Sequence, residues 1–256
     1  MKKILLILVL AIILLSIFVF YNNNNPKIVI SSLIKKGDIR QGDLIYRVDL
    51  FGIIPVAKAI LKAEQIDEYS GQRVYHLSAS ASLLKWMAKF FKGYALLDSY
   101  IDTETCNPVL FKQKMIITGK KAIDKKAVYD QKKAIMTIAG VRRQILPNTQ
   151  DALSAIYNIR YIDFDNVKEL EFNINTNQKN YILGATARVN KDILINNRIY
   201  KTVFLKGEIR RRDKNPYHQS KIAMVLLKVK EKENIPILIK VFASGIFINA
   251  KLIDIK

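Results

Sequence analysis

Three runs near the C-terminus decide the fold class: IAMVLLKVK at residues 222–230, ILIKVFAS at 237–244 and FINAKLIDI at 247–255. The two-residue period of a β-strand dominates these runs. Short polar or glycine-containing segments separate them, so neighbouring runs are expected to pair as antiparallel strands.

Similar runs fill most of the remaining chain. Further strands are predicted at residues 44–51, 54–66, 73–81, 94–102, 109–118, 127–131, 134–146, 169–175, 181–189 and 199–211. So many strands joined by short turns predict a mainly β fold, with an antiparallel sheet curled into a barrel or half-barrel. No composition shift divides residues 43–256, so we expect a single β-rich domain there.

Helical spacing interrupts the strands at residues 82–93. The segment has an apolar side opposite a lysine side: Leu83, Trp86, Met87, Phe90 and Phe91 against Lys85, Lys89 and Lys92. Ser82 and Gly93 suit the two ends of a helix. Interfacial membrane helices are built in this way, and so are helices that plug the open end of a barrel. Trp86, Phe90 and Phe91 are therefore candidate ligand or membrane contacts.

A second helix is predicted at residues 149–160, after Pro147. Asn148 or Thr149 is the expected N-cap, and Asp151 in the first turn suits the helix dipole. Leu153, Ile156 and Tyr157 form its buried side.

The first 20 residues predict export. Two lysines precede an unbroken apolar run from Ile4 to Phe20, and a polar stalk at residues 21–42 follows. No small-x-small cleavage site follows the run, which favours an uncleaved signal anchor in the cell membrane over a cleaved signal peptide. Because both lysines precede the run, we expect the remainder outside the cytoplasm, in the periplasm.

The formal net charge of +20 has two interpretations. It could attract anionic lipid headgroups or an anionic envelope polymer, or it could reflect only a lysine-rich composition. The sequence contains no helix-turn-helix, zinc-finger or aromatic RNA-binding motif, so no nucleic-acid partner is expected.

No catalytic, cofactor-binding or metal-binding motif stands out. The chain has two histidines and one cysteine, Cys106, too few for a multi-histidine or multi-thiolate metal centre. His76 shares one strand face with Ser78 and Ser80, which could line a ligand cavity or face solvent. Asp98 and Asp102 could pair as catalytic carboxylates, but such spacing is typical of a solvated strand face. We therefore expect no cofactor and no enzyme activity, with a cryptic polymer hydrolase as a remote alternative.

Several segments together resemble a bacterial family of exported proteins, domain-of-unknown-function family 3108. The segment at residues 150–160, QDALSAIYNIR, resembles the family's Asp-x-Leu-Ser-x-x-Tyr-x-x-Arg helix. Tyr46–Val48, Ser99–Asp102 and Ile235–Ile237 match at other points. The resemblance implies an envelope protein with a curled antiparallel sheet, similar in general plan to periplasmic lipoprotein carriers, and no established reaction.

The matched helix also has an interpretation from its residues alone. Asp151, Ser154, Tyr157 and Arg160 are predicted to form a structural motif, in which Arg160 reaches a carboxylate or carbonyl and locks the helix across the sheet. A ligand clamp is the alternative role for Arg160. The sequence as a whole predicts a non-enzymatic envelope protein that binds a lipid or other amphipathic ligand, or else a module that tethers an envelope partner through its basic surface.

Overall fold

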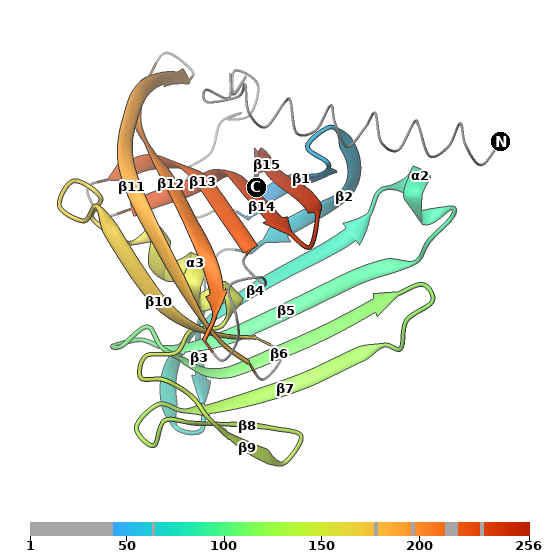
Figure 1. Ribbon diagram of the computed structural model, residues 1–256, viewed down its shortest axis with the longest axis vertical. Coiled ribbons are helices and arrows are strands. Elements are labelled where there is room, and N and C mark those ends of the chain that lie inside the picture. Colours follow the sequence, from blue (N-terminus) through green and yellow to red (C-terminus); the bar gives the residue numbers. More distant parts are fainter. Residues whose placement is uncertain (1–42, 63–64, 177–178, 196–197, 213–219, 231–232) are drawn as a thin grey trace. The chain divides into compact units, whose positions relative to one another are not determined.

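The computed structural model describes residues 43–256 apart from 63–64, 177–178, 196–197, 213–219 and 231–232 (Figure 1). The predicted export segment and polar stalk lie outside the described residues. Within the described part of the chain, no helix has the length and apolar character that crossing a membrane requires.

One 15-stranded antiparallel sheet contains all the named strands. The strands are β1 Leu44–Leu50, β2 Ile54–Leu61, β3 Gln65–Tyr69, β4 Gln72–Leu83, β5 Gly93–Asp102, β6 Pro108–Ile117, β7 Ile123–Asp130, β8 Ile135–Ile138, β9 Val141–Gln144, β10 Glu169–Thr176, β11 Lys179–Ile195, β12 Arg198–Arg211, β13 Ser220–Lys230, β14 Glu233–Ala243 and β15 Ile246–Ile255. Within the described residues two helices accompany them, α2 Lys85–Ala88 and α3 Ala152–Arg160. The strand order is β10-β11-β12-β13-β14-β15-β1-β2-β4-β5-β6-β7-β8-β9, and β3 pairs with β4 outside this path.

Tight turns join many neighbouring strands. Between β14 and β15, Ser244 and Gly245 take φ angles of 51° and 78°. Two successive positive φ values are typical of a type I′ turn, whose twist matches that of paired strands. Ser70 and Gly71 have the same sign of φ between β3 and β4, where the sequence predicts a turn.

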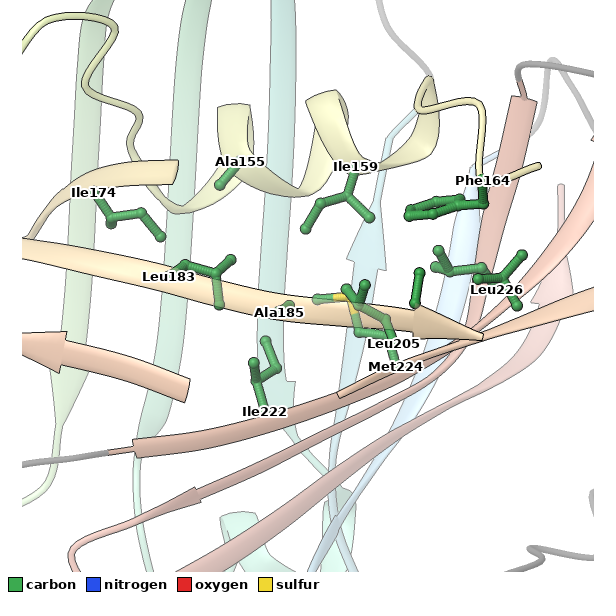
Figure 2. Packing of buried hydrophobic residues seen from close by; sticks show 12 residues of the cluster. Ala155, Ile159, Phe164, Ile174, Leu183, Ala185, Leu205, Ile222, Met224 and Leu226 are labelled. Atoms are coloured by element: carbon green, nitrogen blue, oxygen red, sulfur yellow. The ribbon is translucent and has the colours of Figure 1, made fainter. Parts of the chain in front are cut away.

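Helix α3 packs against two distant parts of the sheet. Ala155 and Ile159 join a buried cluster with side chains of β10 to β13 (Figure 2). Leu153 and Tyr157 pack instead against side chains of β4 and β5. Because these two groups of strands are far apart in the strand order, the sheet bends across the helix.

The predicted barrel closure is wrong, since the sheet is neither closed nor strongly curled. Its end strands are β10 and β9, and no described ladder joins them. Gln150 occupies the edge of β10 instead: its N–H donates to Asn173 O at 2.7 Å, and its carbonyl accepts from Asn175 N at 2.9 Å. Part of the β10 edge is therefore already bonded to the segment before α3.

The predicted helix at residues 82–93 is also wrong in extent. β4 continues to Leu83, α2 is a single turn, and β5 begins at Gly93. Ser82 does not cap a helix but pairs with Tyr94 across β4 and β5. A Cβ atom at Gly93 would lie 2.8 Å from Leu83 Cγ, so glycine leaves room for the Leu83 side chain where this connection ends.

The mainly β prediction is confirmed for the strands. Two predicted runs are each divided: residues 54–66 form β2 and β3, and residues 134–146 form β8 and β9. Helix α3 begins later than predicted, because Asp151 is the N-cap in place of Asn148 or Thr149. Thr149 Oγ1 instead donates to Leu146 O at 2.6 Å.

Candidate functional site

One end of the sheet carries most of the exposed large apolar side chains of the described residues. The β14–β15, β1–β2, β4–β5 and β6–β7 connections share this end because neighbouring strands are antiparallel. Phe51 N donates to Phe247 O at 2.7 Å, and Leu84 N donates to Val56 O at 2.9 Å, so adjacent connections are bonded together. We call this region the apolar end. Its exposed apolar side chains are Ile53, Ile54, Trp86, Phe90, Phe91, Tyr94, Ile116, Ile117, Phe242, Ile246 and Ile248.

The aromatic residues singled out by the sequence lie at the tip of β4 and β5, in α2 and the turn after it (Figure 1). Trp86, Phe90 and Phe91 are 45%, 70% and 52% exposed. Trp86 Nε1 donates to Pro55 O at 3.0 Å, which ties the indole to β2 while much of the ring stays in solvent. No residue of α2 is buried, so this turn does not plug a core.

A shallow groove of about 420 Å³ runs between this turn and the end of β6. Residues 88–92 form one wall, and Ile116, Ile117 and Thr118 form the other. Lys92 N donates to Thr118 Oγ1 at 2.5 Å and holds the walls together. The groove is wide enough for a small amphipathic group, since ligand sites commonly measure about 300–1,000 Å³.

The charge around the groove is mostly positive, and the exception is Asp124, which pairs with Lys114 across β6 and β7. Every charged residue within 84–93 and 114–122 is a lysine: Lys85, Lys89, Lys92, Lys114, Lys120 and Lys121. All six are exposed. Aromatic rings surrounded by ammonium groups form a surface that attracts anions and also offers apolar area.

His76 lies away from the apolar end, about 23 Å along β4 from Leu83 at the usual rise of a strand. Its ring stacks on Tyr100, with centroids 4.4 Å apart and planes 3° apart. Its Nε2 atom is 3.0 Å from Asp98 Oδ1, and Lys112 Nζ lies 5.1 Å from the centroid of the Tyr100 ring. The structure therefore places His76 in a cross-strand cluster of its own and does not bring it together with Trp86.

The N-terminus of α3 contains a buried carboxylate. Asp151 is 1% exposed and accepts hydrogen bonds from Leu153 N at 2.8 Å and Ser154 N at 3.0 Å. Asp151 N donates to Ser154 Oγ, which completes a capping box. Ser99 Oγ of β5 donates to Asp151 Oδ2 at 2.6 Å, so the cap also fixes the helix to the sheet.

The Asp151 carboxyl makes stability depend on pH. Burial raises its pKa, although hydrogen bonds from Ser99, Ser154 and Leu153 oppose the shift. The Asp151 carboxyl therefore binds its proton more tightly in the folded state than in the unfolded state. The stability that this proton contributes is lost as pH rises from the unfolded pKa, about 3.9, through the raised pKa of the folded state. We expect wild type to lose stability relative to Asp151→Asn over that window in denaturant titrations. Parallel pH curves for the two proteins, or the same difference for the exposed control Asp124→Asn, would contradict this.

A small cavity lies beside Asp151. It measures about 100 Å³ and is lined by residues of β5 to β8 and by the start of α3, among them Leu97, Phe111 and Met136. This volume is well below the usual range of ligand pockets, about 300–1,000 Å³. It does not accommodate a long acyl chain.

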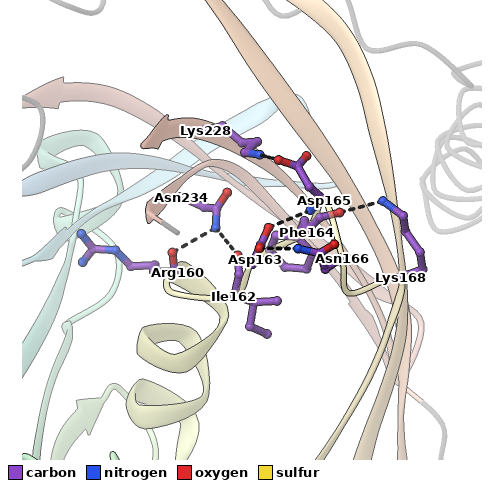
Figure 3. A network of polar contacts seen from close by, with 9 residues as sticks. All are labelled: Arg160, Ile162, Asp163, Phe164, Asp165, Asn166, Lys168, Lys228 and Asn234. Carbon is purple, nitrogen blue, oxygen red and sulfur yellow. Dashed lines mark hydrogen bonds and ion pairs between the residues drawn. The ribbon is translucent and has the colours of Figure 1, made fainter. Parts of the chain in front are cut away.

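The far end of α3 is held through its backbone. Asn234 Nδ2 donates to Arg160 O at 3.0 Å and to Ile162 O at 2.9 Å (Figure 3). The Nε atom of Arg160 does not make the predicted locking contact, since it is buried and has no hydrogen-bond partner among the described residues. Tyr157 contributes through its ring, which contacts those of Tyr75 and Tyr161 at centroid distances of 5.9 and 4.8 Å.

Comparison with known proteins identifies the family. The family model described as "Protein of unknown function (DUF3108)" matches residues 45–245. The chain belongs to the DUF3108 family. A solved structure described as a beta-barrel-like protein of the domain of unknown function DUF1849 from Brucella abortus is similar, with a TM-score of 0.56 and 10% identity. The match covers 86% of this chain and 99% of that one, and at this identity it shows a shared fold. No curated protein matches this DUF3108 chain.

The sequence interpretation missed most of the apolar end, since it singled out only Trp86, Phe90 and Phe91. Ile53, Ile116 and Ile246 flank turns within or next to strands, where an apolar residue is ordinarily assigned to a core face. Their shared position emerges only from the strand order. A usable signal was present in the sequence, since each lies within a few residues of a turn glycine.

Proposed function

We propose that this DUF3108 protein is a non-catalytic cell-envelope protein whose apolar end docks on an anionic lipid surface. The observation that carries the proposal is the clustering of exposed Trp86, Phe90 and Phe91 among lysines at one end of the sheet. Contiguous exposed apolar area on a folded domain marks an interaction site.

The chemistry of this end fits a lipid headgroup region. Burying a phenylalanine side chain contributes about 1.5–3 kcal/mol, and each lysine near an anionic membrane adds about 1 kcal/mol. Tryptophan suits the boundary because its ring is apolar and its N–H is bonded, here to Pro55 O. If residues 4–20 anchor the chain as the sequence predicts, docking would take place on a membrane already close by.

Lipid held inside the sheet has less support. The cavity beside Asp151 is about 100 Å³, whereas the open groove at the apolar end is about 420 Å³. We therefore place lipid contact at the end of the sheet and not in its interior.

The fluorescence of Trp86 tests the proposal, because Trp86 is the only tryptophan in the chain. In full-length protein reconstituted into vesicles, we expect its emission to shift to the blue when an anionic lipid is included. The shift should diminish at high salt, since exposed charges are screened. An emission maximum that is identical with and without anionic lipid would count against the proposal.

Charge variants separate local attraction from net charge. Replacing Lys85, Lys89 and Lys92 by glutamine should reduce the shift, because these lysines surround the aromatic residues. The matched control replaces three exposed lysines that lie away from the apolar end, Lys132 after β7 and Lys201 and Lys206 of β12. If both triple variants lose the shift equally, overall charge and not the apolar end governs docking.

A further inference from the structure

The Arg160 guanidinium is a buried cation without a partner. Arg160 is 9% exposed, and its Nε atom is completely buried and forms no hydrogen bond. In Figure 3 its side chain points away from the polar contacts that join Asp163, Asp165 and Lys228. Neither a carboxylate nor a carbonyl of the described residues accepts a hydrogen bond from this Nε atom.

The residues around Arg160 offset only part of the free-energy cost of burying its charge. The Tyr161 ring lies 5.8 Å from the guanidinium carbon, a cation–π distance. Burial raises the pKa of the Tyr46 hydroxyl, and the positive charge of Arg160 opposes this rise. The Tyr46 hydroxyl donates to Pro236 O at 2.8 Å and stays protonated, so it supplies no negative charge. Buried charges in proteins are ordinarily paired, and this one has no anion within the chain that the structure describes.

We propose that Arg160 binds an oxyanion, the carboxylate or phosphate group of a ligand, between the end of α3 and strands β1 and β14. Nε is fully buried and unpartnered, so a ligand would meet the terminal nitrogens of the guanidinium. A guanidinium matches two oxygens of such a group with parallel N–H donors. The ring of Tyr161, which contacts that of Tyr157, provides apolar surface beside it.

This site is separate from the apolar end and shares no residue with it. Asn234 fixes the backbone of Arg160 through the carbonyl, which leaves the side chain unused by the fold. The contact that the structure gives the guanidinium itself is the Tyr161 ring, 5.8 Å from its carbon.

Thermal unfolding of the full-length protein in detergent tests the site with two probes, inorganic phosphate and dihexanoyl phosphatidic acid, against sodium chloride at equal ionic strength. We expect at least one probe to raise the melting temperature saturably, by about 5 °C at high occupancy. A response to phosphate indicates a free anion, and a response only to the phosphatidic acid indicates a lipid phosphate. If neither probe exceeds chloride, the proposal is wrong.

Variants assign the response to Arg160. Arg160→Met keeps the apolar stem and should abolish the response, without loss of stability in the absence of probe, because it removes an unpaired buried charge. Arg160→Lys keeps the charge and should respond more weakly, and the exposed control Arg73→Met should respond fully. A full response in Arg160→Met, or none in Arg73→Met, would overturn the proposal. Trp86 docking should be unchanged in Arg160→Met, so the two proposals fail separately.

Discussion

Replacing Phe90 and Phe91 together by aspartate is expected to reduce docking of the apolar end by at least about 100-fold. Each phenylalanine transferred from water contributes about 1.5–3 kcal/mol, and every 1.4 kcal/mol is a factor of ten in the equilibrium. Two carboxylates would also be repelled by anionic lipid. The blue shift of Trp86 in anionic vesicles reports the docked fraction.

The stability of this double variant should barely change. Phe90 and Phe91 are 70% and 52% exposed, and surface changes away from caps and core usually stay within about 0.5 kcal/mol. The matched control replaces Ile66 and Ile199 by aspartate; both are exposed, and they lie toward the opposite end of the sheet. Undiminished docking of the Phe90 and Phe91 variant, or equal loss in the control, would refute the assignment.

Phe164→Ala should produce the largest loss of stability, about 3–5 kcal/mol. Phe164 is fully buried in the turn after α3, within the cluster formed by the helix and β10 to β13 (Figure 2). Its position is fixed by Lys168 Nζ, which donates to Phe164 O at 2.8 Å, so the turn cannot readily collapse into the vacated space. Denaturant titration followed by circular dichroism measures the loss.

An exposed phenylalanine provides the control for this prediction. Phe242 of β14 is 38% exposed and should lose less than about 1 kcal/mol on replacement by alanine. Equal losses at Phe164 and Phe242 would mean that the cluster beneath α3 does not carry the stability assigned to it.

The strands could be predicted because alternation is a local property. In β4, Leu77 faces α3, whereas His76 faces away and stacks on Tyr100, as a period of two requires. The segment at residues 82–93 could not be assigned correctly, because its apolar residues recur at helical spacing. In the structure this segment is mostly strand ends and a short turn, and Phe90 and Phe91 are exposed there. The local pattern of apolar residues cannot distinguish side chains that are buried in a core from side chains that are exposed for contact with another molecule.

Features that depend on distant contacts could not be predicted. The sheet stays open, and Gln150 bonds to the edge of β10, a contact that no sequence period encodes. The chemistry at the two ends of α3 also differs from the expectation: Ser99 reaches Asp151 from β5, and Arg160 is left without the partner that the helix pattern suggested. The family resemblance singled out this helix. In the structure, the Asp151 carboxyl group at its start has hydrogen-bond partners, whereas Arg160 Nε at its end has none among the described residues.

Quenching of Trp86 by lipids brominated at different depths tests the central claim most directly. Because Trp86 is the only tryptophan, the full-length protein in anionic vesicles reports on the apolar end alone, whatever the membrane contacts of residues 4–20. Docking predicts strong quenching by lipids brominated near the headgroup and loss of that quenching in the Phe90 and Phe91 variant. Emission that no brominated lipid quenches would contradict the account.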